Sequence, residues 1–258
     1  MNAPAQGLFI TGTDTGVGKT TVTAALLTLL RTRGVDAVPM KPIQTGCLKR
    51  GGEVVAPDLD CCLRAARLTP TVAEAEWMCP YRFIPACSPH LAARIDRRPI
   101  QVRRIVSAFR RLASRHDYVL VEGAGGVLVP LDGRRTMLDL MRALGLPVLV
   151  VARPGLGTLN HTLLTLAALR AAKLDIAGVV VVATQRGRRG RIERDNLASI
   201  ARLGRSPVLG RLPYITAQAD FHKTVARFSK DWKLAPPFFP SLGKTRVTLS
   251  QALENARA

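Results

Sequence analysis

The stretch ITGTDTGVGKTT, from Ile10 to Thr21, contains the residue types that bind phosphate. In a P-loop, backbone N–H groups at the start of a helix wrap a phosphate, a lysine spans the β- and γ-phosphates, and a threonine hydroxyl binds Mg²⁺. Lys19 and Thr20 occupy those two positions here. The usual spacing, G-x-x-x-x-G-K-[ST], requires a glycine where this chain has Thr13, and Gly12 lies one residue too early. We therefore predict a phosphate site with a variant loop.

Two acidic positions are candidates to complete a magnesium site with Thr20. Mg²⁺ needs further oxygen ligands, which are usually carboxylates at the carboxyl ends of neighbouring strands. Glu122 ends the apolar run YVLVE and is the leading candidate. Asp58 is the second candidate, with Asp60 as its competitor. The alternative for Asp58 is an acidic residue at a helix N-terminus that interacts only with the helix dipole. The predicted ligands are Thr20, Asp58 and Glu122, with the choice between Asp58 and Asp60 left open.

Lys41 is a candidate catalytic residue. It follows a short apolar run and precedes Pro42, so its ammonium should project from the carboxyl edge of a strand, where open α/β sheets bind ligands. Thr45 and Gly46 would keep a hydroxyl and a close backbone within reach. The alternative is a solvated surface lysine.

The elements that must position these residues follow a repeating pattern. Short apolar runs alternate with segments of helical period, which predicts an α/β fold of the P-loop NTPase type, with a mostly parallel sheet and helices on both faces. Strands are expected at residues 8–11, 37–40, 118–121, 147–152 and 176–183. Helices are expected at residues 20–33, 58–68, 102–113 and 157–171, and another opens at Pro89 with Ser88 as its N-cap.

The alternation stops after Pro213, which sets the predicted domain organisation. We expect a P-loop α/β catalytic domain over residues 1–215 and a C-terminal extension of unclear structure over residues 216–258. No apolar run reaches the roughly 18 residues of a membrane helix, and no signal peptide is recognisable. The five cysteines are odd in number and form no C-x-x-C pair. These features predict a cytoplasmic protein without a membrane partner.

The charge is strongly basic, with a formal net charge of +20 and a pI near 11.2. Such values require that nucleic-acid binding be considered. The densest cluster, RGRRGRIER from Arg186 to Arg194, lacks the aromatic residues that stack on single strands. We expect a solvated loop or an anion-attracting rim there rather than a nucleic-acid surface. The charge would also favour anionic small substrates by raising their local concentration.

Five motifs occur in the same order as in the dethiobiotin synthetases, the ATP-dependent carboxylases of biotin biosynthesis. They are GTDTGVGKTT, MKPIQTG, PACSPH, VLVEGAGG and GLGTLNHTLLT. The resemblance runs from about Leu8 to Tyr214. It implies a P-loop homodimer that closes the ureido ring of dethiobiotin from 7,8-diaminononanoate, CO₂ or bicarbonate, and ATP, with Mg²⁺ as the cofactor.

The resemblance also implies a mechanism and assigns residues to it. One substrate amine captures CO₂ as a carbamate, the carbamate attacks the γ-phosphate, and the second amine closes the ring as phosphate leaves. Lys19 and Lys41 would stabilise the transferring phosphoryl group and the carbamate. The implied ATP-binding residues are Gly16, Val17, Gly18, Lys19, Thr20, Thr21, Asp58, Glu122, Gly123, Ala124, Gly125, Pro213, Tyr214, Ile215 and Asp220. The implied substrate-binding residues are Thr15, Thr45, Thr158, Leu159 and Asn160, the last three at a helix N-terminus of the partner subunit.

The chain departs from the family pattern in places that concern its ligands. Gly16 stands where some members carry a glutamate. After the strand that ends at Val182 the family has an asparagine that reads adenine, whereas this chain has Ala183-Thr184-Gln185, so the base preference is left open. Arg194 falls near a family tyrosine that helps bind the substrate carboxylate, a role suited to a guanidinium.

The alternative function is that of a partitioning-type P-loop ATPase, a nucleotide-switched dimer acting on DNA or a membrane. Those ATPases carry a lysine directly after the first loop position, where this chain has Asp14. The basic charge keeps the DNA-binding version open, while Lys41-Pro42 and the EGAGG turn favour the synthetase.

Overall fold

The computed structural model describes residues 7–186, 190–215, 218–228 and 232. Its centre is a six-stranded sheet in the order β10-β9-β8-β1-β7-β2, in which every strand pair is parallel. The strands are β1 (Gly7–Gly12), β2 (Ala37–Met40), β7 (Tyr118–Glu122), β8 (Val148–Ala152), β9 (Ile176–Val182) and β10 (Val208–Leu212). The predicted P-loop α/β class is confirmed.

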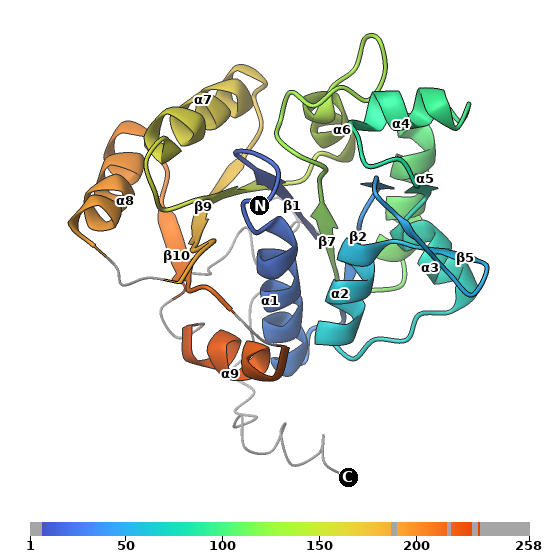
Figure 1. Cartoon of the computed structure of the whole chain (residues 1–258), viewed down its shortest axis with the longest axis horizontal. Coiled ribbons are helices and arrows are strands. Elements are labelled where there is room, and N and C mark those ends of the chain that lie inside the picture. The colour runs from blue at the N-terminus through green and yellow to red at the C-terminus, as the bar shows by residue number, and fades with distance from the viewer. Residues whose placement is uncertain (1–6, 187–189, 216–217, 229–231, 233–258) are drawn as a thin grey trace.

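Helices cover both faces of this sheet (Figure 1). The helices that the structure describes are α1 (Lys19–Thr32), α2 (Pro57–Ala65), α3 (Val72–Met78), α4 (Pro89–Ile95), α5 (Val102–Ala113), α6 (Met137–Leu144), α7 (Thr158–Ala171), α8 (Arg191–Leu203) and α9 (Gln218–Phe228). Two short ribbons lie beside the main sheet: β3 (Ile43–Gln44) pairs parallel with β6 (Tyr81–Arg82), and β4 (Leu48–Arg50) pairs antiparallel with β5 (Glu53–Val55).

Alternating strand residues supply two separate hydrophobic cores. In β7, Val119 and Val121 face the core built with α5, α6, α7 and α8, whereas Tyr118 and Leu120 face the core built with α1 and α9. Strands buried on both faces read as continuous apolar runs, which is why the central strands were predictable from the sequence. The parallel arrangement places the carboxyl ends of β1, β2 and β7 at one edge of the sheet.

The C-terminal part of the chain contains a helix where the sequence left the structure unclear. In the extension predicted for residues 216–258, α9 begins at Gln218 and packs against α1, α2 and β10. Phe221 and Val225 of α9, together with Trp232, belong to the core on the α1 face. The signal was available, since apolar residues four positions apart lie on one face of a helix.

The basic cluster is only partly a loop. A solvated loop or an anion-attracting rim was predicted for Arg186 to Arg194, and its last four residues form the first turn of α8, which begins at Arg191. Arg186 is exposed in the segment after β9, and residues 187–189 lie outside the described part. The described part of the chain contains no helix that is long and apolar enough to cross a membrane.

Candidate nucleotide and metal site

The variant spacing of the P-loop has a geometric reason. The loop connects β1 to α1 and folds back over Gly12, where a Cβ atom would lie 2.7 Å from Val17 Cγ2 and 2.8 Å from the Asp14 carbonyl oxygen. Gly18 has φ +99°, and a Cβ atom there would lie 2.7 Å from Val182 Cγ1. Glycine is therefore required at both positions, and the displaced glycine is part of a closely packed loop rather than a damaged one.

Lys19, the first residue of α1, is buried beneath this loop. Its Nζ donates a hydrogen bond to the Asp14 carbonyl oxygen at 2.8 Å. Burial, followed by the neighbouring Lys41 ammonium, lowers the pKa of Lys19 to about 8, although Glu122 and Asp58 oppose the shift. The Lys19 ammonium is therefore a buried charge that the Asp14 carbonyl oxygen does not neutralise.

Lys41, at the end of β2, forms the centre of the site. Its Nζ lies 2.7 Å from Glu122 Oε1 at the end of β7 and 2.7 Å from Asp58 Oδ2 on α2, and it donates to the Gly123 carbonyl oxygen at 3.2 Å. The side chains of Lys41 and Glu122 are 5% and 3% exposed, and that of Asp58 is 32% exposed. Burial alone would lower the pKa of Lys41, but the two carboxylates outweigh it and raise the pKa.

Thr20 joins the same cluster from the first turn of α1. Its hydroxyl donates to Glu122 Oε1 at 2.9 Å, the oxygen that also accepts from Lys41. Asp58 is held by its backbone N–H, which donates to Gln44 Oε1 at 3.3 Å. Burial would raise the pKa of Asp58, but the Lys41 ammonium outweighs it and keeps that pKa below its usual range.

These donors have the chemistry of a magnesium site. Two carboxylates and a hydroxyl around one point are hard oxygen ligands, and Mg²⁺ commonly takes one or two carboxylates together with phosphates and waters. Within the described residues no group of three or more His, Cys, Asp and Glu side chains could hold a metal. Asp60, the competing candidate, instead pairs with Arg64 at 3.2 Å.

The glycine-rich turn after β7 packs against the P-loop. The Gly123 N–H donates to the Ile10 carbonyl oxygen at 2.9 Å, which ties the turn to β1. A Cβ atom at Gly125 would lie 3.6 Å from Thr15 Oγ1, so the turn and the loop approach each other there. The structure therefore brings Thr15 of the P-loop close to Gly125 of the turn.

The predicted base-binding segment lies next to the loop as well. Val182, whose side chain contacts Gly18, ends β9, and Thr184 and Gln185 follow it with exposed side chains. The Ala183 N–H donates to the Leu212 carbonyl oxygen at 2.9 Å, which places the end of β10 beside them.

The segment after β10 contains the other predicted base-binding residues. Pro213 and Ile215 are half-buried there, and Tyr214 is 45% exposed. Asp220 lies in α9, and its side chain falls outside the described part.

At the start of α7, one of the three candidate residues has an exposed side chain. Thr158 is buried, with its hydroxyl 3.3 Å from that of Thr162, and Leu159 packs against the core. Asn160 is exposed. Thr45, the other candidate for the substrate, is half-buried, and its carbonyl oxygen accepts from Gln44 Nε2 at 3.0 Å.

Three side chains near these segments were missed by reasoning from the sequence. Gln44 holds Asp58, as described above. Arg153 follows β8 and lies 3.7 Å from Asp14 of the P-loop. Asn196 of α8 donates to the Pro154 carbonyl oxygen at 2.9 Å. Arg153 carried the same signal as Glu122, a charged residue directly after an apolar strand, whereas nothing local marks Asn196. Arg194, a candidate for the carboxylate, is exposed on the same helix.

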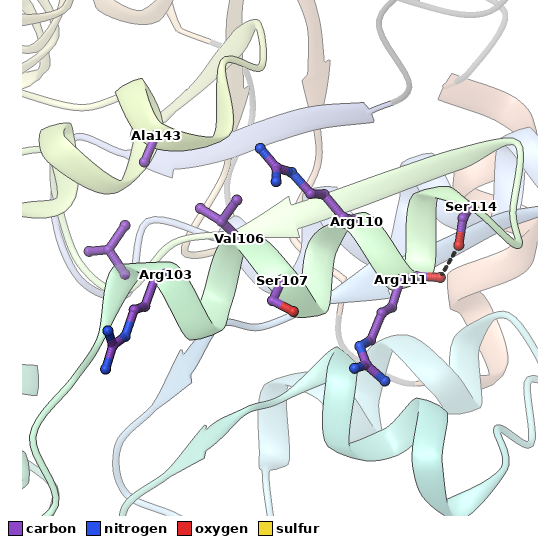
Figure 2. A pocket seen from close by; sticks show the side chains of 8 residues that line it. Arg103, Val106, Ser107, Arg110, Arg111, Ser114 and Ala143 are labelled. Atoms are coloured by element: carbon purple, nitrogen blue, oxygen red, sulfur yellow. Dashed lines mark hydrogen bonds between the residues drawn. The ribbon is translucent and has the colours of Figure 1, made fainter.

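A second concave region is separate from all of these residues. It is a surface groove of about 570 Å³ along α5, closed on one side by Ala143 of α6 (Figure 2). Figure 2 shows Val106 pointing toward Ala143, while Arg103 and Arg111 point to the other side of the helix. Because it contains none of the predicted site residues, we do not identify this groove with the nucleotide site.

Comparison with known proteins gives the family that this chain resembles. A family model described as an AAA domain matches residues 6–220. An ATP-dependent dethiobiotin synthetase BioD from Anaeromyxobacter dehalogenans (strain 2CP-C) is 48% identical over 209 residues, which cover 81% of this chain and 90% of that protein. The synthetase of the same name from Anoxybacillus flavithermus is 39% identical over 228 residues, or 88% of this chain and 99% of that protein.

Solved structures support the fold alone. The MinC:MinD cell division protein complex of Aquifex aeolicus matches with a TM-score of 0.54 at 16% identity, covering 86% of each chain. The septum site-determining protein MinD of Pyrococcus horikoshii, complexed with Mg-ADP, matches with a TM-score of 0.53 at 18% identity, covering 81% of each chain.

Proposed function

The chain belongs to the dethiobiotin synthetases, which are ATP-dependent ligases, and we propose that it carboxylates 7,8-diaminononanoate and closes the ureido ring of dethiobiotin. The identity of 48% to one such synthetase, against 16% to 18% for the MinD structures, favours this activity over that of a partitioning-type ATPase. Substrates are 7,8-diaminononanoate, CO₂ or bicarbonate, and ATP.

The observation that carries the proposal is the pair of buried lysines beside the P-loop. Lys19 lies at the start of α1, and Lys41 reaches the same region from the end of β2. A carbamate and a triphosphate are both anions, and bringing them together requires positive charge that is already in place. Lys41 lies outside the loop, at the edge where a second anion could bind beside the phosphates.

Each lysine has a separate task in the proposed reaction. Lys19 and the loop N–H groups bind the β- and γ-phosphates and align the phosphoryl group for in-line attack. Lys41 stabilises the carbamate that one substrate amine forms with CO₂. It then stabilises the charge that develops as the carbamate oxygen attacks the γ-phosphorus, ADP leaves and a carbamic-phosphoric anhydride forms. The second amine attacks the carbonyl carbon of the mixed anhydride, and phosphate leaves as the ring closes.

Thr20, Asp58 and Glu122 are the residues that would hold Mg²⁺, which supplies charge neutralisation on the phosphates when bound. Their oxygens converge around the Lys41 ammonium, which supports this assignment. Asp58 is proposed in preference to Asp60 because only Asp58 faces the cluster.

The diamine is proposed to lie between Thr15, Thr45 and the turn from Glu122 to Gly125. Its carboxylate would bind at the N-terminus of α7 of a partner subunit in a homodimer, where free N–H groups and the helix dipole favour an anion. The exposed Asn160 and the fully exposed Leu156 nearby support such a contact between subunits.

The nucleotide base is proposed to lie near Pro213, Tyr214 and Ile215, with Asp220 of α9 and the exposed Thr184 and Gln185 as further candidates. These segments follow β9 and β10, which end beside the P-loop through Val182. The family's adenine-reading asparagine has no counterpart there, so discrimination among bases is the property to measure.

The test is a product assay with the purified protein. Supplied with 7,8-diaminononanoate, bicarbonate and Mg-ATP, it should release one phosphate per dethiobiotin formed. Parallel reactions without the diamine, and with duplex DNA in its place, serve as controls. Phosphate release that does not need the diamine, or that DNA stimulates, would overturn the proposal.

A further inference from the structure

We propose that Lys41 makes metal binding depend on the nucleotide, because its ammonium already pairs with both carboxylates that a divalent cation would need. The inference rests on the metal ligands named in the proposed function, and it concerns the order in which ligands bind rather than the chemical step. It assigns Lys41 a role before catalysis begins.

The geometry shows how Lys41 links the two carboxylates. An ammonium has three N–H donors. Those of Lys41 are taken by Glu122 Oε1 at 2.7 Å, Asp58 Oδ2 at 2.7 Å and the Gly123 carbonyl oxygen at 3.2 Å. One buried cation therefore bridges the two carboxylates.

Glu122 Oε1 is also the acceptor for the Thr20 hydroxyl, at 2.9 Å. A metal held by Thr20, Asp58 and Glu122 would use the same two carboxylates, whose negative charge the ammonium already balances at 2.7 Å. Each carboxylate keeps a second oxygen, so the metal and the ammonium compete chiefly through charge.

The charges of the cluster explain why a nucleoside triphosphate would relieve the competition between the metal and Lys41. Asp58 and Glu122 are balanced by Lys41 and Lys19, and Lys19 is itself buried without a carboxylate partner within salt-bridge distance in the described structure. A divalent cation arriving alone would add positive charge to a site with low exposure, where like charges repel strongly. Arriving with a nucleoside triphosphate, it brings phosphate oxygens to which Lys41 can transfer its hydrogen bonds.

The experiment measures Mn²⁺ binding by electron paramagnetic resonance, with and without a non-hydrolysable ATP analogue. Lys41→Met removes the ammonium and keeps the length of the side chain. Without nucleotide, this variant should bind Mn²⁺ roughly tenfold or more tightly than the wild type, because the carboxylates no longer have a competing cation. The analogue should increase Mn²⁺ affinity by a smaller factor in the variant than in the wild type.

Lys49→Met is the matched control. Lys49 is exposed on β4, so its replacement removes the same charge away from the carboxylates and should leave Mn²⁺ affinity unchanged. An unchanged or weaker Mn²⁺ affinity in Lys41→Met would overturn the proposal, and so would equal strengthening by Lys49→Met, which would indicate an effect of overall charge.

A structural measurement covers the case in which Lys41→Met does not fold. Wild-type crystals soaked with Mn²⁺ and the ATP analogue should show an anomalous peak at Asp58 and Glu122, with Lys41 Nζ moved to a phosphate oxygen. A metal bound there while Lys41 still bridges both carboxylates would refute the exchange. Neither measurement uses the diamine, so the proposed synthetase activity and the metal coupling succeed or fail separately.

Discussion

The two lysines of the site differ in how burial and charge set their protonation. Lys41 is buried between two carboxylates, which raise its pKa and keep it charged. Lys19 is buried against a backbone carbonyl, and burial followed by repulsion from Lys41 lowers its pKa to about 8. Lys41 is stable as a cation in the folded protein. The charge of Lys19 near neutral pH lowers the free energy of unfolding, and a bound phosphate would offset this destabilisation.

This difference leads to a prediction for Lys19→Met in the protein without nucleotide. Below about pH 8 the folded and unfolded states both keep the Lys19 proton, and the folded state carries the full cost of the buried charge. The variant should therefore have the larger free energy of unfolding at pH 7. As pH rises from about 8 toward 10.5, the folded wild type loses the proton first and the advantage of the variant should shrink.

Urea unfolding at a series of pH values measures this trend. The exposed Lys49→Met should show a small difference from the wild type that does not change over the same range. An advantage of Lys19→Met that grew with pH would contradict the assignment of a lowered pKa.

At the scale of elements, the site depends on loops at the carboxyl edge that other elements hold in place. The P-loop is pressed against the end of β9 through Gly18 and Val182. The loop from β8 to α7 is fixed to α8 by Asn196, while its Arg153 reaches Asp14 of the P-loop. The positions of both loops thus depend on elements distant in the sequence.

Gly18→Ala tests the contact between the P-loop and β9. The substitution combines a left-handed backbone with a Cβ atom 2.7 Å from Val182, and it should lower the free energy of unfolding by about 2 kcal/mol or more. Gly34→Ala is the control, since its φ is +83° and a Cβ atom there meets open space, so only the backbone term of about 1 kcal/mol is expected. Urea unfolding and ADP binding are the measurements, and equal losses would show that the contact with Val182 is unimportant.

Asn196→Ala tests the anchor of the loop before α7. Without the hydrogen bond to Pro154, the start of α7 should be held less firmly, and the KM for 7,8-diaminononanoate should rise several-fold with little change in kcat. Asp195→Ala, an exposed neighbour on α8, should leave both constants unchanged. Steady-state kinetics give the answer, and a fall in kcat at constant KM would be inconsistent with a role in binding the carboxylate.

At the scale of the whole molecule, two cores on either side of one sheet carry the site. Segments after residue 215 complete the core on the α1 face through Phe221, Val225 and Trp232. Trp232 is 8% exposed, and a Cβ atom at Gly210 would lie 2.5 Å from its ring, so the indole packs directly on β10. We therefore propose that the catalytic domain of residues 1–215 is stabilised by part of the C-terminal extension.

Trp232→Ala should accordingly destabilise the whole domain. Removing a buried tryptophan leaves a cavity against β10 and should cost about 3 kcal/mol in the free energy of unfolding. Tyr214→Ala removes an aromatic ring that is 45% exposed and should cost less than about 1 kcal/mol. Urea unfolding measures both changes, and losses of similar size would show that Trp232 is not part of the core.

The sequence by itself determined the phosphate loop, the parallel sheet and several members of the site. Each of these has a local signal: Gly18, Lys19 and Thr20 lie between an apolar run and a helical period, and Lys41 and Glu122 directly follow or end apolar runs. In a parallel sheet the carboxyl ends of all strands meet at one edge, so position along the chain was enough to place these residues on the same side.

Only the tertiary structure decided how the residues meet. Thr20 and Glu122 are 102 positions apart, yet Glu122 Oε1 accepts hydrogen bonds from both the Thr20 hydroxyl and Lys41 Nζ. They meet because the strand order places β7 between β1 and β2. The choice of Asp58 over Asp60 follows from the direction in which α2 packs, since residues two positions apart on a helix point to different sides. Strand order and helix orientation arise from burial of apolar surface over the whole chain, and no short stretch of sequence contains that information.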